Sequence, residues 1–215
     1  MPVPSNLLAT FSEECFYHVI CKSIEGKKLF YNDNNRMFFL KKYKELLTGF
    51  IDTYTYTLMD NHVHWFIKTK TASEILLYLN TIQIKEATST HKRFIAGNCS
   101  FHELIEQQFN RLFISYALTL NKSRNTTGHL FNRPFKRIEI SDDAHFTQVI
   151  VYIHTNIKRH GVSNDFHLYK WSSYLAILSL DETSIKRDEV LEWFGGRDRF
   201  IELHQAWADD YYGME

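Results

Sequence analysis

The sequence has few cysteines, no long apolar run and no excess of either charge. Its three cysteines, Cys15, Cys21 and Cys99, are an odd number and lack the spacing of metal ligands. A disulfide framework is therefore not expected, and a reducing, cytoplasmic setting fits the composition. No apolar stretch is long enough to span a membrane, and the first residues lack the basic and apolar regions of a signal peptide, so no membrane partner is expected.

What the chain does contain is enough apolar material for a core. Hydrophobic residues make up 44% and aromatic residues 15% of its 215 residues, which argues against disorder and suits one domain with an appendage. Residues 181–215 hold ten acidic and four basic residues, so this stretch carries −6 and residues 1–180 carry +6. We therefore divide the chain into a main domain, residues 1–180, and a helical acidic C-terminal extension, residues 181–215. A basic main domain permits a nucleic-acid partner without requiring one.

Two neighbouring strands are predicted in the middle of the main domain. Threonines alternate with aromatic and apolar residues over 53–58, a turn follows at 60–61, and residues 62–68 form a second strand. Side chains two positions apart on a strand share a face, so His62 and His64 project together. Two neutral imidazoles so placed form half of a divalent-metal site, although such a pair can also be two half-buried polar residues.

Predicted helices and strands alternate along the rest of the main domain. Their order is strand, helix, strand, strand, helix, helix, strand, followed by a helix that ends near residue 160 and by short helical pieces after residue 171. This order predicts an α+β fold that is ferredoxin-like, with an antiparallel sheet and helices on one face. The further strands are expected at 16–22 and 135–140, and the helices at 32–48, 73–94, 101–121 and 141–160.

The helix predicted to end near residue 160 carries a tyrosine and an amide on one face. Tyr152 and Asn156 are four residues apart, so they lie one helical turn from each other. Considered alone, these two residues are more simply explained as polar side chains on the surface of a helix. Beside the strand of His62 and His64, it suggests a nucleophilic tyrosine whose neighbouring amide completes the coordination shell of a metal ion.

Four motifs occur in a fixed order between residues 16 and 175. They are Met59-Asp-Asn-His-Val-His64, Gly128-His-Leu-Phe-Asn-Arg-Pro-Phe-Lys136, Tyr152-Ile-His-Thr-Asn156 with Gly161, and Tyr169-Lys-Trp-Ser-Ser-Tyr174. Together they resemble the motifs of the HUH single-tyrosine transposases, and within that family the REP-associated tyrosine transposase branch. Each motif is weak alone, and the resemblance rests on the four occurring in order.

The resemblance implies an HUH endonuclease-like fold and a metal-dependent single-stranded DNA endonuclease and strand transferase. A divalent cation, Mg²⁺ or Mn²⁺, is expected on His62, His64 and Asn156. Tyr152 is expected to attack the scissile phosphate and form a 5′-phosphotyrosine link. The expected partner is single-stranded DNA near a hairpin or palindromic repeat, and the assembled state stays open between monomer and homodimer.

A basic segment precedes the last predicted strand. Five bases and no acid lie between residues 122 and 137, with Phe131 and Phe135 among them. This composition predicts contacts with the DNA backbone and stacking on bases, while a solvated basic loop is the alternative. The residues predicted to bind DNA are Lys122, Arg124, Arg133, Lys136, Arg137, Lys158 and Arg159.

The chain also departs from the family pattern. Asp60 and Ile157 stand where the family usually has proline, and Asp60 would add negative charge near the metal. Residues 81–99 look like extra length, and a net charge of zero is atypical for a DNA-processing enzyme. None of these departures removes an expected catalytic residue.

Two other functions fit part of the pattern. One is a non-catalytic, domesticated relative that binds DNA hairpins, against which the intact His62, His64, Tyr152 and Asn156 argue. The other is a different metal-dependent phosphoryl-transfer enzyme, because a His-x-His pair also occurs in nucleotide hydrolases. The histidine-triad type of hydrolase needs a third alternating histidine where this chain has Phe66, which counts against it. The rival nucleophiles Tyr116, Tyr169 and Tyr174 lie in segments that are more simply interpreted as core or packing.

Overall fold

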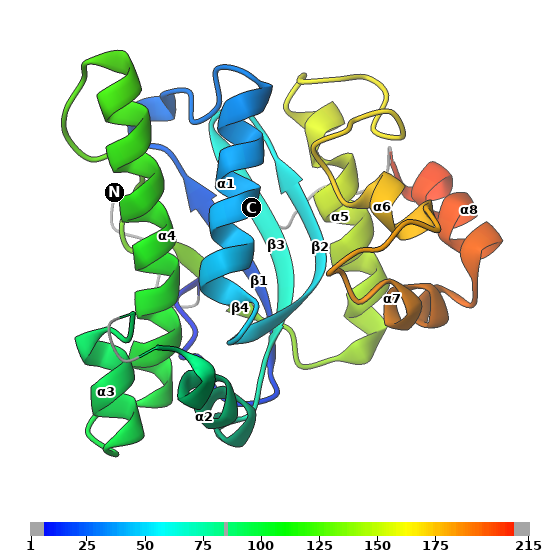
Figure 1. The fold of residues 1–215 in the computed structure, drawn as a ribbon. Helices are drawn as coiled ribbons and strands as arrows, with labels where there is room; N and C mark the ends of the chain where they lie inside the picture. Colours follow the sequence, from blue (N-terminus) through cyan, green and yellow to red (C-terminus); the bar gives the residue numbers. More distant parts are fainter. Residues whose placement is uncertain (1–6, 84–85, 209–215) are drawn as a thin grey trace.

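A computed structural model describes residues 7–83 and 86–208 of the chain. The described residues form a four-stranded antiparallel sheet in the order β2-β3-β1-β4 (Figure 1). This confirms the α+β class and the predicted antiparallel sheet. The strands are β1 (Phe16–Lys22), β2 (Ile51–Leu58), β3 (His62–Thr69) and β4 (Lys136–Glu139).

Two long helices, α1 (Asp33–Leu47) and α4 (Phe101–Arg124), cover one face of the sheet, as predicted. The side chain of Asn32 caps α1 by accepting a hydrogen bond from the Asn35 amide. Alternate residues of the central strands, such as Val19 and Trp65, pack under these helices against residues such as Phe39 of α1 and Phe109 of α4. We call this cluster of buried side chains the first core.

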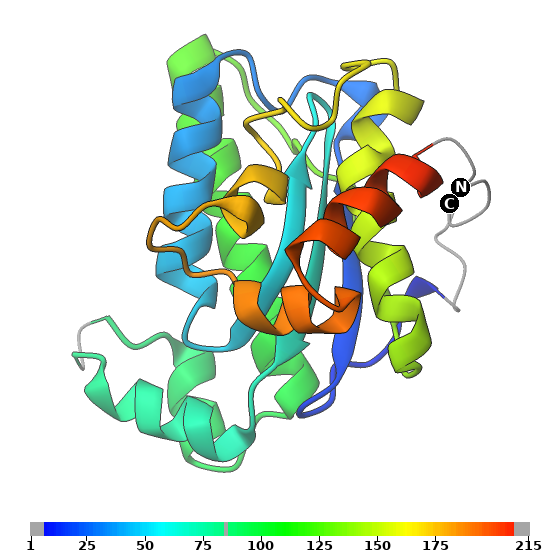
Figure 2. The ribbon, with the colours of Figure 1, turned by 90° about the vertical axis from the view of Figure 1, so that its right-hand side faces the viewer.

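The opposite face is covered by α5 (Phe146–Arg159), and three short helices of the C-terminal part pack beside it (Figure 2). Phe66 and Ile153 belong to this second core, together with Phe200 from the extension. Because side chains alternate along β3, His62 and His64 face α5 and not the first core. The short helices are α6 (Tyr174–Leu178), α7 (Arg187–Phe194) and α8 (Arg197–Trp207).

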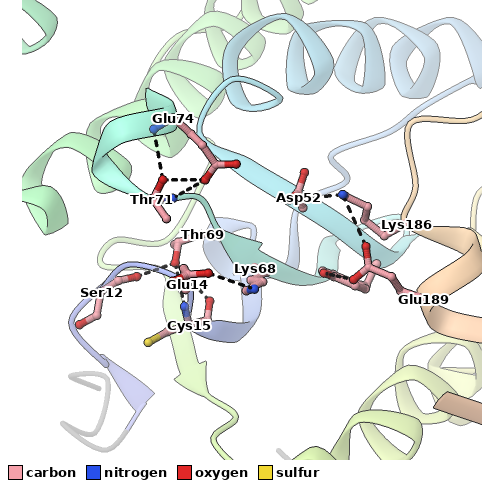
Figure 3. Close-up of polar contacts among 11 residues, drawn as sticks. Ser12, Glu14, Cys15, Asp52, Lys68, Thr69, Thr71, Glu74, Lys186 and Glu189 are labelled. Atoms are coloured by element: carbon pink, nitrogen blue, oxygen red, sulfur yellow. Dashed lines mark hydrogen bonds and ion pairs between the residues drawn. The ribbon is translucent and has the colours of Figure 1, made fainter. Parts of the chain in front are cut away.

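Two predicted helices begin or break elsewhere in the structure. The long helix expected over 73–94 is divided into α2 (Ala72–Thr81) and α3 (Ser89–Ile95), on either side of a segment whose residues 84–85 lie outside the described part. Thr71 caps α2, and its hydroxyl forms a capping box with Glu74 (Figure 3). The helix expected from residue 141 begins at Phe146, because Asp142 caps a separate 3₁₀ turn, η3 (Asp143–His145).

The C-terminal extension is tied to the outer strand β2. The Lys186 amide donates to the Thr53 carbonyl oxygen over 2.9 Å, and its ammonium lies 3.7 Å from a carboxylate oxygen of Asp52 (Figure 3). The Tyr54 hydroxyl donates to Glu189 of α7 over 2.7 Å. The boundary at residue 180 stays a prediction from composition, and residues 209–215 of the extension lie outside the described part. In residues 7–83 and 86–208 no helix is long and apolar enough to cross a membrane.

Candidate functional site

The residues predicted to form the site come together between β3 and α5. The rings of His62 and His64 lie with their centroids 5.1 Å apart. The Asn156 amide nitrogen is 3.3 Å from Nε2 of His64, and the Tyr152 ring centroid is 5.9 Å from that of His64. Four residues from two elements thus form one cluster, and its closest contact between the elements joins residues 92 positions apart in the sequence.

Polar side chains on β2 fix α5 against the sheet beside this cluster. Thr57, which is the register partner of His64, donates from its hydroxyl to the Ile153 carbonyl oxygen over 2.8 Å. The Thr55 hydroxyl oxygen lies 2.7 Å from Nε2 of His154, the residue of α5 between Tyr152 and Asn156. Buried hydrogen bonds of this kind have fixed directions, so they set both the height and the rotation of the helix that carries Tyr152 and Asn156.

A third histidine, His18 of β1, also belongs to the cluster and was not predicted. Its Nε2 lies 2.9 Å from Nδ1 of His64, and its ring contacts the Tyr152 ring edge-on with centroids 5.6 Å apart. The only signal in the sequence is a histidine inside the otherwise apolar and aromatic run of residues 16–21. That signal does not say which strand lies beside it, so the contact with His64 required the sheet order.

The cluster is closed to solvent in this structure. His64, Tyr152 and Asn156 are each 0% exposed, and His62 is 3% exposed. Burial, reinforced by the neighbouring His18 and other basic groups, holds the pKa of His64 well below its ordinary value. His64 is therefore a neutral imidazole at physiological pH, which is the form that binds metal ions. A phosphate group can reach Tyr152 only after the side chains over it move.

The residues present fit a divalent cation in their chemistry. Oδ1 of Asn156 is buried and accepts no hydrogen bond from any described residue. Neighbouring ligands of an octahedral cation lie about 3 Å apart, since each is ~2.1 Å from the ion, and the Asn156 amide nitrogen is 3.3 Å from Nε2 of His64. Turning that amide over would bring its oxygen to this position. Across residues 7–83 and 86–208 no group of three or more His, Cys, Asp or Glu side chains could hold a metal. A cation bound by His62 and His64 would therefore take Asn156 as its third protein ligand.

Part of the predicted basic surface lies near this cluster. The Arg159 guanidinium is 5.1 Å from the centroid of the Tyr152 ring, and the ring of His160 is 4.6 Å from that of His62. The segment of residues 122–136 reaches the same end of the sheet: its Asn132 amide donates to the Lys22 carbonyl oxygen of β1 over 2.9 Å. The members of the predicted set that remain exposed or half-buried are Lys122, Arg124, Arg133, Lys136, Lys158 and Arg159.

Arg137 is a correction to the predicted DNA-binding set. It is 6% exposed, pairs with Glu106 of α4 at 3.2 Å and donates to the Ala9 carbonyl oxygen over 2.6 Å. Phe131 and Phe135, expected to stack on bases, are both buried in the first core. Adjacent residues of a strand face opposite sides, so Arg137 turns inward where Lys136 does not.

Asp60 uses its carboxylate elsewhere than the sequence suggested. Its Oδ1 accepts a hydrogen bond from the Arg36 guanidinium over 2.5 Å, and its Oδ2 lies 3.1 Å from the Lys28 ammonium. Two cations therefore offset its charge, and its contacts hold the loop before α1 against the turn between β2 and β3. These contacts do not support the expectation that Asp60 adds negative charge near the metal.

The rival tyrosines have structural partners. Tyr116 is buried and donates to the Leu29 carbonyl oxygen, and Tyr169 donates to the Leu58 carbonyl oxygen over 2.7 Å. Tyr174 packs its ring on Phe200 and His204 in the second core. None of these three has a ring contact with His62 or His64, whereas Tyr152 contacts His64.

Comparisons with known proteins give structural likenesses but no family. No protein-family model matches the chain, and no curated protein matches it. A solved structure of the REP-associated tyrosine transposase bound to a REP hairpin aligns with a TM-score of 0.47 and 12% sequence identity, covering 79% of this chain and 82% of that one. A likeness at this level carries no argument about function, so the proposal below rests on the geometry of the cluster and on the sequence motifs.

Proposed function

We propose that this chain is a metal-dependent single-stranded DNA endonuclease and strand transferase that cleaves DNA near hairpins. One observation carries the proposal: His62 and His64 on β3 meet Tyr152 and Asn156 on α5 in a single cluster. Imidazole donors, an amide oxygen and a phenol nucleophile are the groups that a metal-assisted phosphoryl transfer needs. The order of the four sequence motifs supports the same assignment.

In the proposed reaction, the phenol oxygen of Tyr152 attacks the scissile phosphorus. A bond from phosphorus to the tyrosine oxygen forms as the bond to the 3′ oxygen of the preceding nucleotide breaks. The phenol proton ends on that 3′ oxygen, and the 5′ phosphate stays on the protein. Attack by a 3′ hydroxyl on this link reverses the exchange and rejoins a strand, because the phosphodiester energy is conserved. A cation held by His62, His64 and Asn156 would supply neutralisation of the phosphate charge.

Basic groups near the cluster suit the approach of the strand. The Arg159 guanidinium lies over the Tyr152 ring, which puts a cation beside the proposed nucleophile. We call residues 122–136 the basic loop. The Arg124 guanidinium, at its start, lies 3.6 Å from the centroid of the Tyr31 ring, so the loop begins beside the segment that precedes α1. Lys122, Arg133 and Lys136 complete the surface that we propose for the DNA backbone, and Arg137 is no longer part of it.

Burial of the nucleophile favours a second candidate function. Tyr152 is 0% exposed, which is also what a structural tyrosine in a non-catalytic, hairpin-binding protein would show. Such a protein would use the basic surface and leave the cluster closed. The two functions make opposite predictions about a covalent product.

The test is incubation of the full chain with Mn²⁺ and a DNA hairpin that carries a single-stranded flank labelled at its 3′ end. The 3′ label reports the covalent product, since the 5′ phosphate side stays on the protein. We expect label on the denatured protein band, and peptide mapping should find it on Tyr152. Binding without an adduct would establish the second function, and a label on any other tyrosine would overturn the nucleophile.

A further inference from the structure

We propose that His18 is a positioning residue of this site, which accepts the Nδ1 proton of His64 and thereby holds His64 with an unprotonated Nε2 turned toward Asn156. The metal-binding consequence rests on the function proposed above. The protonation pattern itself is a property of the chain without metal, and it can be tested separately.

The sheet register brings the two histidines together. In the pairing of β1 with β3, His18 lies opposite Phe66 and Ile20 lies opposite His64, so the two histidines are diagonal neighbours on the face covered by α5. Their rings are inclined by 28° with centroids 5.1 Å apart, and the contact between Nε2 of His18 and Nδ1 of His64 is 2.9 Å. Both residues are buried: His18 is 1% exposed and His64 is 0% exposed.

Counting protons along this chain of contacts gives one consistent pattern. A neutral His64 carries one ring N–H. With the Asn156 amide nitrogen facing it, as in this structure, Nε2 of His64 accepts and carries no proton. If the amide turned over to offer its oxygen to a cation, Nε2 would again have to be unprotonated, because it would bind that cation. The proton of His64 therefore sits on Nδ1 and is donated to Nε2 of His18. In the opposite pattern the Nε2 proton of His64 would face the amide hydrogens of Asn156.

This pattern has a consequence for ligand chemistry. A histidine ligand needs its other nitrogen fixed by a hydrogen bond, and removal of such an outer partner typically costs 10–100-fold in metal affinity. Carboxylates and carbonyl oxygens usually fill that role, and here the partner is a second imidazole. His18 also contacts the Tyr152 ring, so one side chain supports both the proposed ligand and the proposed nucleophile.

The first measurement is the ¹⁵N NMR spectrum of histidine-labelled protein without metal. We expect His64 to be protonated on Nδ1 in the unaltered chain. In His18→Phe, which keeps a ring but removes the acceptor, this pattern should be lost, and His18→Gln, which restores an acceptor oxygen, should recover it in part. His64 protonated on Nε2 in the unaltered chain would overturn the proposal whatever the metal does.

The second measurement is Mn²⁺ affinity by calorimetry on the same proteins, with His91→Gln as a control at a buried histidine on α3 that contacts Gln108. We expect His18→Phe to weaken Mn²⁺ binding 10–100-fold, His18→Gln to weaken it less, and the control to change nothing. Affinity that depends on His64 but is unaffected by His18→Phe would overturn the role of His18 alone. No Mn²⁺ binding by the unaltered chain would instead overturn the proposed function. Circular dichroism checks each fold, and if His18→Phe does not fold, the spectrum of the unaltered chain and His18→Gln decide.

Discussion

Tyr152 differs from the rival tyrosines Tyr116 and Tyr169 in what it contacts. It lies against His18, His64 and Arg159, all of which are polar, while Tyr116 and Tyr169 donate their hydroxyls to backbone carbonyl oxygens. Removing a hydroxyl that joins two segments by a hydrogen bond lowers the free energy of unfolding. Removing a hydroxyl that acts only in the reaction leaves the folded state nearly as stable. The two kinds can be told apart by removing a single oxygen atom.

We expect Tyr152→Phe to fold, bind DNA and bind Mn²⁺, yet to form no covalent adduct. Its free energy of unfolding should change by no more than about 1 kcal/mol, as is usual for one hydroxyl. The matched control is Tyr169→Phe, which should keep the adduct and lose stability because the Leu58 carbonyl oxygen loses its donor. Adduct yield on denaturing gels and urea unfolding measure the two effects. An adduct formed by Tyr152→Phe would exclude Tyr152 as the nucleophile.

At this scale the sequence indicated which residues meet but not how they are oriented. The alternation of β3 and the helical spacing of Tyr152 and Asn156 predicted two pairs of side chains, each on one face, and the resemblance to a known family predicted that the two pairs meet. The role of His18 was not predicted, because its partner His64 lies on a strand far along the chain. That β1 lies beside β3 is set by packing and cannot be taken from the sequence pattern. Arg137 was assigned to DNA because a sequence shows charge but not the Glu106 carboxylate that meets it on α4.

Among the elements, α5 is held in place by contacts from distant parts of the chain. His154 lies between β2 and α8, with its Nε2 2.7 Å from both Thr55 and Ser173 and its Nδ1 2.8 Å from Nε2 of His204. His204 in turn contacts the Phe200 carbonyl oxygen through Nδ1 over 2.8 Å. The extension therefore braces the helix that carries the proposed nucleophile, and the acidic composition of the extension gave no hint of this role.

Truncation of His204 to alanine should lower the free energy of unfolding by about 2–4 kcal/mol, because it leaves a cavity and a buried His154 nitrogen without its partner. Urea unfolding measures this change. His145→Ala is the control, since His145 has 52% of its side chain exposed and should cost little. An equal loss in both variants would mean that the contact between α8 and α5 does not stabilise the fold.

The same contact predicts how stability depends on pH. Burial lowers the pKa of His204 to about 3 from an ordinary value of 6.5. Between these values the unfolded chain binds a proton that the folded chain does not, so the free energy of unfolding should fall as pH drops from 6.5 toward 3. Urea titrations across this window should show a flatter profile for His204→Ala than for the unaltered chain. Parallel profiles would assign the acid sensitivity to other groups.

At the scale of the whole molecule, several loops gather at one end of the sheet, at the top of Figure 1. The Ile24 amide donates to the Leu130 carbonyl oxygen over 3.0 Å, Arg124 lies on Tyr31, and His160 lies beside His62. The basic loop and the candidate cluster therefore share that end. The ferredoxin-like order of elements was predictable from periodicity, whereas the second helical layer was not, because nothing in α5 alone specifies the face on which it packs.

Neutralising Lys122, Arg133 and Lys136 together by substitution with glutamine should reduce the salt dependence of DNA binding. Each phosphate contact on a single strand contributes about 0.7 to the slope of log affinity against log salt, so three lost contacts reduce the slope by about 2. Fluorescence anisotropy with a labelled hairpin gives the slope. The matched control replaces Lys41, Lys44 and Lys92, which removes the same charge from other helices. Equal slopes for both triple variants would exclude the loop as the DNA contact.

The closed state of the cluster has a consequence for how the proposed activity would be restrained. If the open form is a small fraction of the population, apparent affinity for substrate is lowered by that same fraction. A short unstructured strand then cannot offset the cost of opening, whereas a hairpin that also contacts the basic loop can. Latency of this kind would make the fold itself a source of specificity. If the proposed function holds, a nucleophile that is buried at rest would leave the single strands of replication and repair uncut.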